Sequence, residues 1–181
     1  MVVTRTAIPE VLIIEPKVFG DARGFFFESY SRRDFAQATG IDAEFVQDNH
    51  SRSLHNVLRG LHYQLRQPQG KLVRVTLGEI WDVAVDLRRS SPSFGRWVSF
   101  ELSAATKRMA WIPPGFAHGF LVTSAAAEVQ YKTTDYYAPE HERTLLWNDP
   151  ALAIPWPLAG TPIMTEKDQR GRPLAEAEGC A

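Results

Sequence analysis

Residues 71–87 read KLVRVTLGEIWDVAVDL, and their alternation decides the fold class. Apolar side chains recur at every second position on both sides of Gly78-Glu79, first from Val73 to Leu77 and then from Trp81 to Leu87. A period of two residues is that of a β-strand, and a glycine between two such runs is typical of a turn. The stretch therefore predicts an antiparallel hairpin.

The same spacing of apolar runs and turn residues extends along most of the chain. Further strands are expected at Val11–Ile14, Gly24–Tyr30, Glu44–Asp48, Val57–Tyr63, Trp97–Leu102, Arg108–Ile112, Gly119–Thr123, Glu128–Thr134 and Thr144–Trp147. One helix is predicted at residues 32–39, between Ser31 as its N-cap and Gly40 at its end. A second short helix is expected near Glu166–Gln169. About ten short strands with one or two short helices predict an all-β fold, a jelly-roll or related antiparallel barrel.

The composition is that of an ordinary globular protein, with 181 residues, 44% of them hydrophobic, and a net charge of −1. This length predicts one domain over residues 1–181. The near-neutral charge argues against nucleic acid or an anionic membrane as a partner, and no apolar run approaches the roughly 18 residues of a membrane span. The only cysteine, Cys180, has no partner for an internal disulfide, and the N-terminus lacks a signal-peptide pattern. We therefore expect a cytoplasmic location.

Polar side chains occur on strand faces that should be apolar: Lys71 beside Val73, Tyr131 beside Val129, His62 at the parity of Leu58, and His118 beside Phe120. Each alone has an ordinary structural interpretation, such as a lysine that reaches solvent at a strand end or a histidine bonded within the core. Two histidines, a lysine and a tyrosine that point into one barrel are, however, the content of an acid–base site in a partly dry cavity.

Pro113, Gly115 and His118 form the pattern P-x-G-x-x-H, which is the second motif of the cupin superfamily, whose barrels commonly bind a metal. The first cupin motif supplies two histidines spaced H-x-H, but His62 is followed here by Tyr63 and Gln64. Two histidines without a third ligand are a poor metal site. We expect no metal, and a metal-dependent cupin oxygenase or isomerase is the alternative.

Several blocks in order resemble one metal-free branch of the cupins, the dTDP-4-dehydrorhamnose 3,5-epimerase family, over nearly the whole chain. The matching blocks are Phe19–Glu28, Phe45–Ser51, Leu58–Gln64, Gln69–Arg74, Ile112–Phe120, Tyr131–Arg143 and Glu166–Asp168. The resemblance implies an isomerase that converts dTDP-4-dehydro-6-deoxy-D-glucose to dTDP-4-dehydro-L-rhamnose by inversion at C3 and C5, a step of dTDP-L-rhamnose biosynthesis. It also implies a cupin-type antiparallel jelly-roll barrel, a homodimer and no cofactor.

The resemblance further implies roles for single residues. His62 is the expected base, oriented by Asp168, with Tyr131 as the acid on the opposite face of the sugar and Lys71 as the stabiliser of the enolate. Tyr137 is expected to stack on thymine. The residues expected to bind the substrate are Arg23, Glu28, Gln47, Asp48, Asn49, Arg59, His118, Tyr137, Glu142 and Lys167.

These residue types suit proton transfer beside a ketone. Imidazole has a pKa near neutrality without adjustment, and a fixed cation in a dry pocket stabilises an enolate oxygen. Inversion needs a second group on the other face, and no redox step calls for a nicotinamide or flavin. Two alternatives remain: a relative that inverts only C3 or C5 or moves the keto group, and a non-catalytic sugar-binding cupin.

Overall fold

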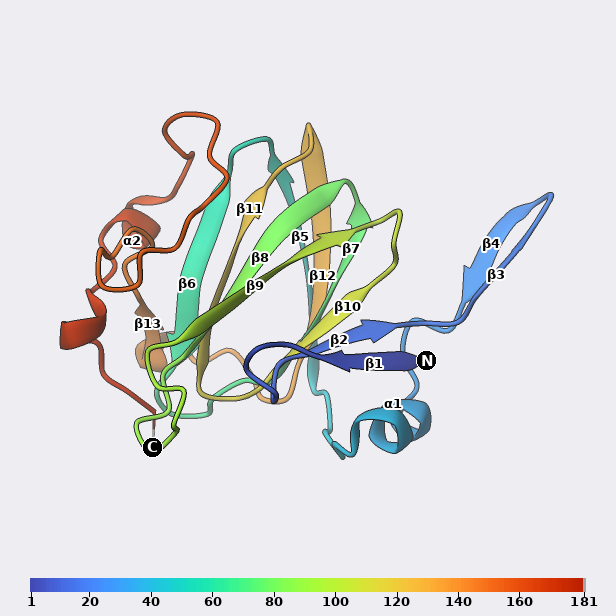
Figure 1. Ribbon diagram of the computed structural model, residues 1–181, viewed down its shortest axis with the longest axis horizontal. Coiled ribbons are helices and arrows are strands. Elements are labelled where there is room, and N and C mark those ends of the chain that lie inside the picture. The colour runs from blue at the N-terminus through green and yellow to red at the C-terminus, as the bar shows by residue number, and fades with distance from the viewer. Residues whose placement is uncertain (181) are drawn as a thin grey trace.

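The computed structural model describes residues 1–180 and consists mainly of two facing antiparallel sheets (Figure 1). The six-stranded sheet has the order β1 (Val2–Arg5), β2 (Leu12–Glu15), β10 (Met109–Ile112), β7 (Lys71–Leu77), β12 (Ala126–Thr133) and β5 (Gln47–Leu54). The five-stranded sheet has the order β13 (Glu142–Thr144), β6 (Leu58–Gln64), β11 (Phe116–Val122), β8 (Glu79–Asp86) and β9 (Trp97–Ser103). The all-β jelly-roll prediction is confirmed.

The remaining elements lie outside the two sheets. Strands β3 (Val18–Asp21) and β4 (Gly24–Phe27) form a hairpin that projects away from the barrel (Figure 1). Helices α1 (Arg32–Thr39) and α2 (Glu166–Gln169) have the predicted bounds. Ser31 Oγ accepts a hydrogen bond from the Asp34 N–H at 3.3 Å, and Gly40 ends α1 at a φ of 75°, as expected of these caps. Within residues 1–180 neither helix is long and apolar enough to cross a membrane.

The predicted hairpin of residues 71–87 is wrong, although β7 has the predicted bounds. Strand β7 pairs with β10 and β12, whereas β8 pairs with β9 and β11. Gly78, with a φ of 73°, turns the chain from one sheet to the other, and a Cβ there would collide with the carbonyl oxygen of Ala126. Alternation of side chains tells which face of a strand is buried, but it does not identify the neighbouring strand.

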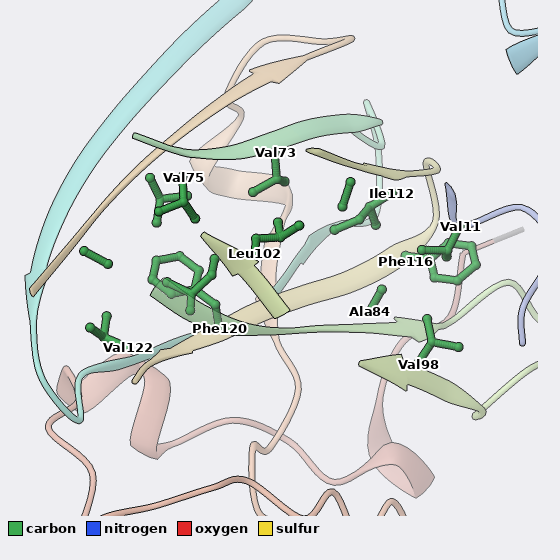
Figure 2. Close-up of a cluster of buried hydrophobic side chains, with 14 of the residues drawn as sticks. Val11, Val73, Val75, Ala84, Val98, Leu102, Ile112, Phe116, Phe120 and Val122 are labelled. Atoms are coloured by element: carbon green, nitrogen blue, oxygen red, sulfur yellow. The ribbon is translucent and has the colours of Figure 1, made fainter. Parts of the chain in front are cut away.

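An apolar cluster fills the space between the two sheets (Figure 2). Val73 and Val75 of β7 meet Ala84 of β8 and Phe116 and Phe120 of β11. On β8 the row of Ile80, Asp82 and Ala84 faces this interior, while Val83 and Val85 face outward into a second apolar cluster. Both faces of β8 are therefore buried.

The outer faces of the two sheets are covered by different parts of the chain. Residues 145–180 pack Leu145, Leu152 and Trp156 onto the five-stranded sheet. Helix α1 packs Phe35 onto the six-stranded sheet, against Leu12, Ile14, Leu72, Met109 and Trp111. The C-terminal cover matters for the site because it carries α2 and Asp168.

Several predicted strand bounds differ from the observed ones. The strand expected at Glu44–Asp48 is instead β5, Gln47–Leu54, and the one expected at Thr144–Trp147 is β13, Glu142–Thr144. Strands β1 and β3 were not predicted. The bounds of β5 were wrong because polar side chains occupy both of its rows, so the sequence shows no apolar period that would mark the strand.

His62 and Leu58 do not share a face, contrary to the parity expected from the sequence. Leu58 is buried in the outer cluster, whereas His62 faces a cavity. The pairing of β6 with β11 shifts register between His118 and Phe120, and a shift of one residue exchanges the two faces of a strand. Gly60 and Gly119 touch at this point, since a Cβ on Gly60 would lie 2.6 Å from the Gly119 Cα.

Candidate functional site

A cavity at one end of the barrel brings together side chains from both sheets. It is lined by His62 and Gln64 of β6, Lys71 of β7, Tyr131 of β12, Tyr137, and Glu142 of β13. His62 and Glu142 belong to the five-stranded sheet, and Lys71 and Tyr131 belong to the six-stranded sheet. The predicted base and the predicted acid therefore line the cavity from opposite sheets.

His62 is held by a buried carboxylate. Its Nε2 lies 2.5 Å from Oδ1 of Asp168, which is 2% exposed. Burial acts to raise the pKa of Asp168, but hydrogen bonds from His62 and Thr165 outweigh it, so that this pKa lies below its usual value. An ionised carboxylate at Nε2 places the imidazole proton there and leaves the Nδ1 lone pair as the basic atom.

Lys71 is a cation in apolar surroundings, only 8% exposed. Burial lowers its pKa to about 8, while the negative charges of Asp82 and Glu142 act in the opposite direction. The side chain is therefore still largely an ammonium group at neutral pH. It can offer a positive donor to an oxygen in the cavity.

His118 forms a second histidine–carboxylate pair, with Asp82 of β8. His118 Nε2 lies 3.0 Å from both carboxylate oxygens, and Asp82 is fully buried. Burial lowers the pKa of His118 and raises that of Asp82, whereas His118 and Lys71 favour the ionised carboxylate. We assign a neutral imidazole that donates from Nε2 to Asp82, and a carboxylate whose charge compensates Lys71.

Asp82 is the site residue that sequence reasoning missed. It lies in the middle of an alternating strand, at the parity of Ile80 and Ala84. The sequence showed it only as part of the row opposite Trp81 and Val83. The signal was available, because an aspartate between two buried apolar positions needs a partner.

Tyr131 faces the cavity with a protonated hydroxyl. Burial raises its pKa above the usual value, while the positive charges of Arg59 and Lys167 act to lower it. The phenol is therefore a proton donor at neutral pH, and the two cations favour the phenolate that remains after donation.

The rim of the cavity is a hydrogen-bonded chain of predicted binding residues. Glu142 Oε2 accepts bonds from Tyr137 Oη and from Lys167 Nζ, both at 2.9 Å. Burial opposes the charge of Glu142, but these two bonds hold its pKa below the usual value. Gln47 donates from Nε2 to Asn49 Oδ1 at 3.0 Å. These five residues are brought together as expected, and Arg59 is close enough to Tyr131 to affect its pKa.

Three predicted binding residues do not meet this cavity within the chain. Arg23 lies at the tip of the β3–β4 hairpin, where it pairs with Asp21 and is highly exposed. Glu28 lines a groove between the hairpin and α1. Asp48 lies on the outer row of β5 and pairs with Lys132 at 2.9 Å.

The position of the missing second cupin histidine is occupied by Gln64, whose amide is fully engaged. It donates to the Gln67 carbonyl at 2.7 Å and accepts from the Ala138 N–H at 3.0 Å. Over residues 1–180 no group of three or more His, Cys, Asp or Glu side chains is arranged to hold a metal ion.

Comparison with known proteins gives consistent matches. The family model described as dTDP-4-dehydrorhamnose 3,5-epimerase matches residues 5–176. The dTDP-4-dehydrorhamnose 3,5-epimerase of Pseudomonas aeruginosa is 64% identical over 178 residues, 98% of each chain. A crystal structure of dTDP-6-deoxy-D-glucose-3,5-epimerase from Legionella pneumophila in complex with dTDP-4-keto-L-rhamnose has a TM-score of 0.95 at 52% identity, over 97% of this chain and 94% of that one. A 3'-monoepimerase from Streptomyces bikiniensis, in complex with dTDP-quinovose, has a TM-score of 0.88 at 31% identity over 94% of this chain and 87% of that one.

The charges around Lys71 predict how its pKa changes when a neighbouring carboxylate is replaced. Replacement Asp82→Asn should move the pKa of Lys71 further below about 8, because it removes the strongest opposing negative charge. Glu142→Gln, which removes the weaker one, should lower the pKa by less. NMR titration of lysine labelled with ¹³C at Cε measures both values, with Lys71→Arg to assign the signal. An unchanged Lys71 pKa in the Asp82→Asn variant would contradict the assignment.

Proposed function

Since the chain belongs to the dTDP-4-dehydrorhamnose 3,5-epimerase family, we propose that His62 and Tyr131 carry out the proton transfers of that family's reaction and that Lys71 stabilises the enolate between them. The chain is an isomerase, a 3,5-epimerase that acts in dTDP-L-rhamnose biosynthesis. Its substrate is a dTDP-linked 4-keto-6-deoxy sugar, in keeping with the ligand of the Legionella relative. The observation that carries the residue assignment is that His62 and Tyr131 line one cavity from opposite sheets.

His62 is the base in this proposal. Nδ1 takes the proton from the carbon beside the C4 ketone, and the electrons of that C–H bond move into the enolate. The imidazolium that forms is stabilised by Asp168 at Nε2, which also fixes the orientation of the ring. The buried position of Asp168 supports this role, because a carboxylate acts more strongly on a neighbouring charge when water is excluded.

Lys71 stabilises the enolate oxygen. The ammonium group is placed in the cavity before reaction, so no reorganisation is needed as the negative charge develops. Asp82 compensates its charge from the interior, and the neutral His118 beside Asp82 positions the keto sugar. No step transfers electrons to or from the sugar, so the proposed reaction needs no redox cofactor, and Lys71 supplies the positive charge that the enolate oxygen requires.

Tyr131 returns a proton to the opposite face of the carbon, which inverts the configuration. The hydroxyl proton forms the new C–H bond, the enolate becomes a ketone again, and the phenolate is left beside the positive charges of Arg59 and Lys167. Exchange with solvent then returns the tyrosine and the histidine to their starting states. The same cycle at C3 and at C5 gives the double epimerisation.

The nucleotide is held at the rim of the cavity in this proposal. Gln47, Asn49, Arg59, Glu142 and Lys167 bind the nucleotide diphosphate, and Tyr137 stacks on thymine. The Tyr137 hydroxyl donates a hydrogen bond to Glu142 at the rim, so the thymine must either fit beside this bond or break it. Asp48, which faces away from the rim, has the weakest support among the expected residues.

We also propose a homodimer, in which Arg23 and Glu28 reach the cavity of the second subunit. The β3–β4 hairpin supports it, because Phe19, Phe25 and Phe26 are 53%, 64% and 70% exposed. A two-stranded hairpin with exposed phenylalanines is at best marginally stable alone in water, so a partner surface explains it. A cytoplasmic location and a single domain over residues 1–181 remain predictions.

His62→Asn should abolish hydrogen exchange at both C3 and C5, a loss of at least about a hundredfold, because the base is removed. Binding of dTDP should be largely retained. The assay is incubation with dTDP-4-keto-6-deoxyglucose in heavy water, followed by NMR. Exposed His55 provides the control, since His55→Asn should leave exchange unchanged. Deuterium at only one carbon with the wild-type chain would favour a single-site epimerase.

Tyr131→Phe should slow product formation by roughly 10²- to 10⁴-fold, the usual contribution of a general acid. Exchange at the carbon attacked by His62 should survive, because proton abstraction does not need the phenol. The control is Tyr136→Phe, at an exposed tyrosine of the same region. Equal losses of exchange and product formation in Tyr131→Phe would show that Tyr131 is not the acid of the second face.

Phe26→Glu should convert the dimer to a monomer, because a charge in an apolar interface loses its hydration without a partner. Light scattering after size-exclusion chromatography measures the molar mass. Ile163→Glu, at an apolar residue outside the hairpin that is also exposed, at 58% against 70% for Phe26, should leave the dimer intact. A dimer that survives Phe26→Glu would place the interface elsewhere.

A further inference from the structure

The segment of residues 135–138 carries Tyr137, and its backbone is bound by glutamine side chains. Gln47 Oε1 accepts from the Tyr137 N–H at 3.1 Å, and Gln69 Nε2 donates to the Asp135 carbonyl at 2.9 Å. Gln64 makes two contacts, accepting from the Ala138 N–H at 3.0 Å and donating to the Tyr136 carbonyl at 3.3 Å. These three glutamines come from β5, from β6 and from the connection between β6 and β7.

Gln64 is the central member of this set. It is 5% exposed, and its Nε2 also donates to the Gln67 carbonyl at 2.7 Å. It lies two residues after His62 on β6, and both side chains line the cavity. The segment that carries Tyr137 is therefore fixed to the strand that carries His62, by a side chain that must both donate and accept.

Tyr137 depends on this backbone support because little else holds it. Its side chain is 52% exposed, and its hydroxyl bonds to Glu142 on the open rim of the cavity. A ring that stacks on a base must lie in one plane at a fixed distance, and a ring that is already placed there avoids the cost of ordering on binding. The position of the ring is set by the backbone at residues 136–138.

We propose that Gln64 is a positioning residue that fixes the Tyr137 ring for the nucleotide base, and so sets affinity for the substrate without taking part in proton transfer. This inference rests on the proposed stacking of Tyr137 on thymine. It gives a role to the residue that replaces the second histidine of the first cupin motif. Gln64 acts through hydrogen bonds to the backbone on both sides of Tyr137, to the Tyr136 carbonyl and to the Ala138 N–H.

The test is Gln64→Leu, which removes every one of these bonds at similar volume. Loss of a stacked aromatic ring costs roughly 5- to 150-fold in affinity, so Tyr137→Ala sets the upper limit. We expect Gln64→Leu to raise KM and the Kd for dTDP about tenfold, while kcat and the exchange rate at saturation change less than about twofold.

A double-mutant cycle distinguishes action through Tyr137 from general loosening. In the Tyr137→Ala background, Gln64→Leu should raise KM by less than about twofold further. Full additivity, or a fall in kcat with KM unchanged, would overturn the proposal, because Gln64 would then act on His62 or on the whole fold.

The controls separate failure of this inference from failure of the proposed function. If Tyr137→Ala raises KM but Gln64→Leu does not, the stacking stands and the positioning role of Gln64 falls. If Tyr137→Ala leaves KM and dTDP binding unchanged, both fall. Should Gln64→Leu not fold, as judged by thermal unfolding, Gln69→Leu removes the bond to Asp135 and should raise KM with kcat unchanged; an unchanged KM there would count against the proposal.

Discussion

A positive charge inside an apolar barrel is the constraint that organises this structure. Lys71 stands on the same row as Val73 and Val75, and an ammonium group in such a place is costly unless a negative charge compensates it. Asp82, on the facing sheet, supplies that charge from a position with no access to water. The hydrogen bond from His118 keeps Asp82 in place. Asp82 and His118 on the five-stranded sheet thus stabilise the charge of Lys71 on the six-stranded sheet.

The two-sheet architecture also explains how one cavity can act on both faces of a sugar ring. Side chains that enter from opposite sheets approach a flat ligand from opposite sides, which is what inversion requires. The carboxylate that orients His62 comes from outside the two sheets, since the C-terminal cover supplies Asp168 through the first turn of α2. The packing of residues 145–180 on the outer face is therefore part of the construction of the site, and a loss of this cover would release Asp168 as well as expose the sheet.

The sequence allowed the class of fold, the bounds of β7, both helices and the residues around His62, Lys71 and Tyr131 to be predicted. Alternation gave the strands, because it reports which face of a strand is buried, and the caps Ser31 and Gly40 gave the bounds of α1. It could not show that Gly78 separates two sheets, since a hairpin and a corner between sheets have the same alternation. The bounds of β5 were predicted wrongly because polar side chains occupy both of its rows, so the strand has no apolar period. Asp82 was missed because both rows of β8 are buried, so the burial of its row did not single it out. Arg23 and Glu28 lie apart from the cavity in this chain, because they belong to the β3–β4 hairpin and to the segment directly after it.

Gln64 stands where the first cupin motif has its second histidine, and this one position changes what a barrel of this type can bind. Imidazole at that position would offer a lone pair to a cation shared with His62 and His118, whereas a primary amide offers a donor and an acceptor at once. The amide suits a neighbouring stretch of backbone, which presents both carbonyl and N–H groups, and Gln64 binds both kinds. With glutamine at this position the interior lacks one metal-binding side chain. In our proposal the same amide orders the rim where the nucleotide binds. In the proposed mechanism the site gains affinity from this exchange, because a Tyr137 ring that is already ordered lowers the cost of binding the nucleotide.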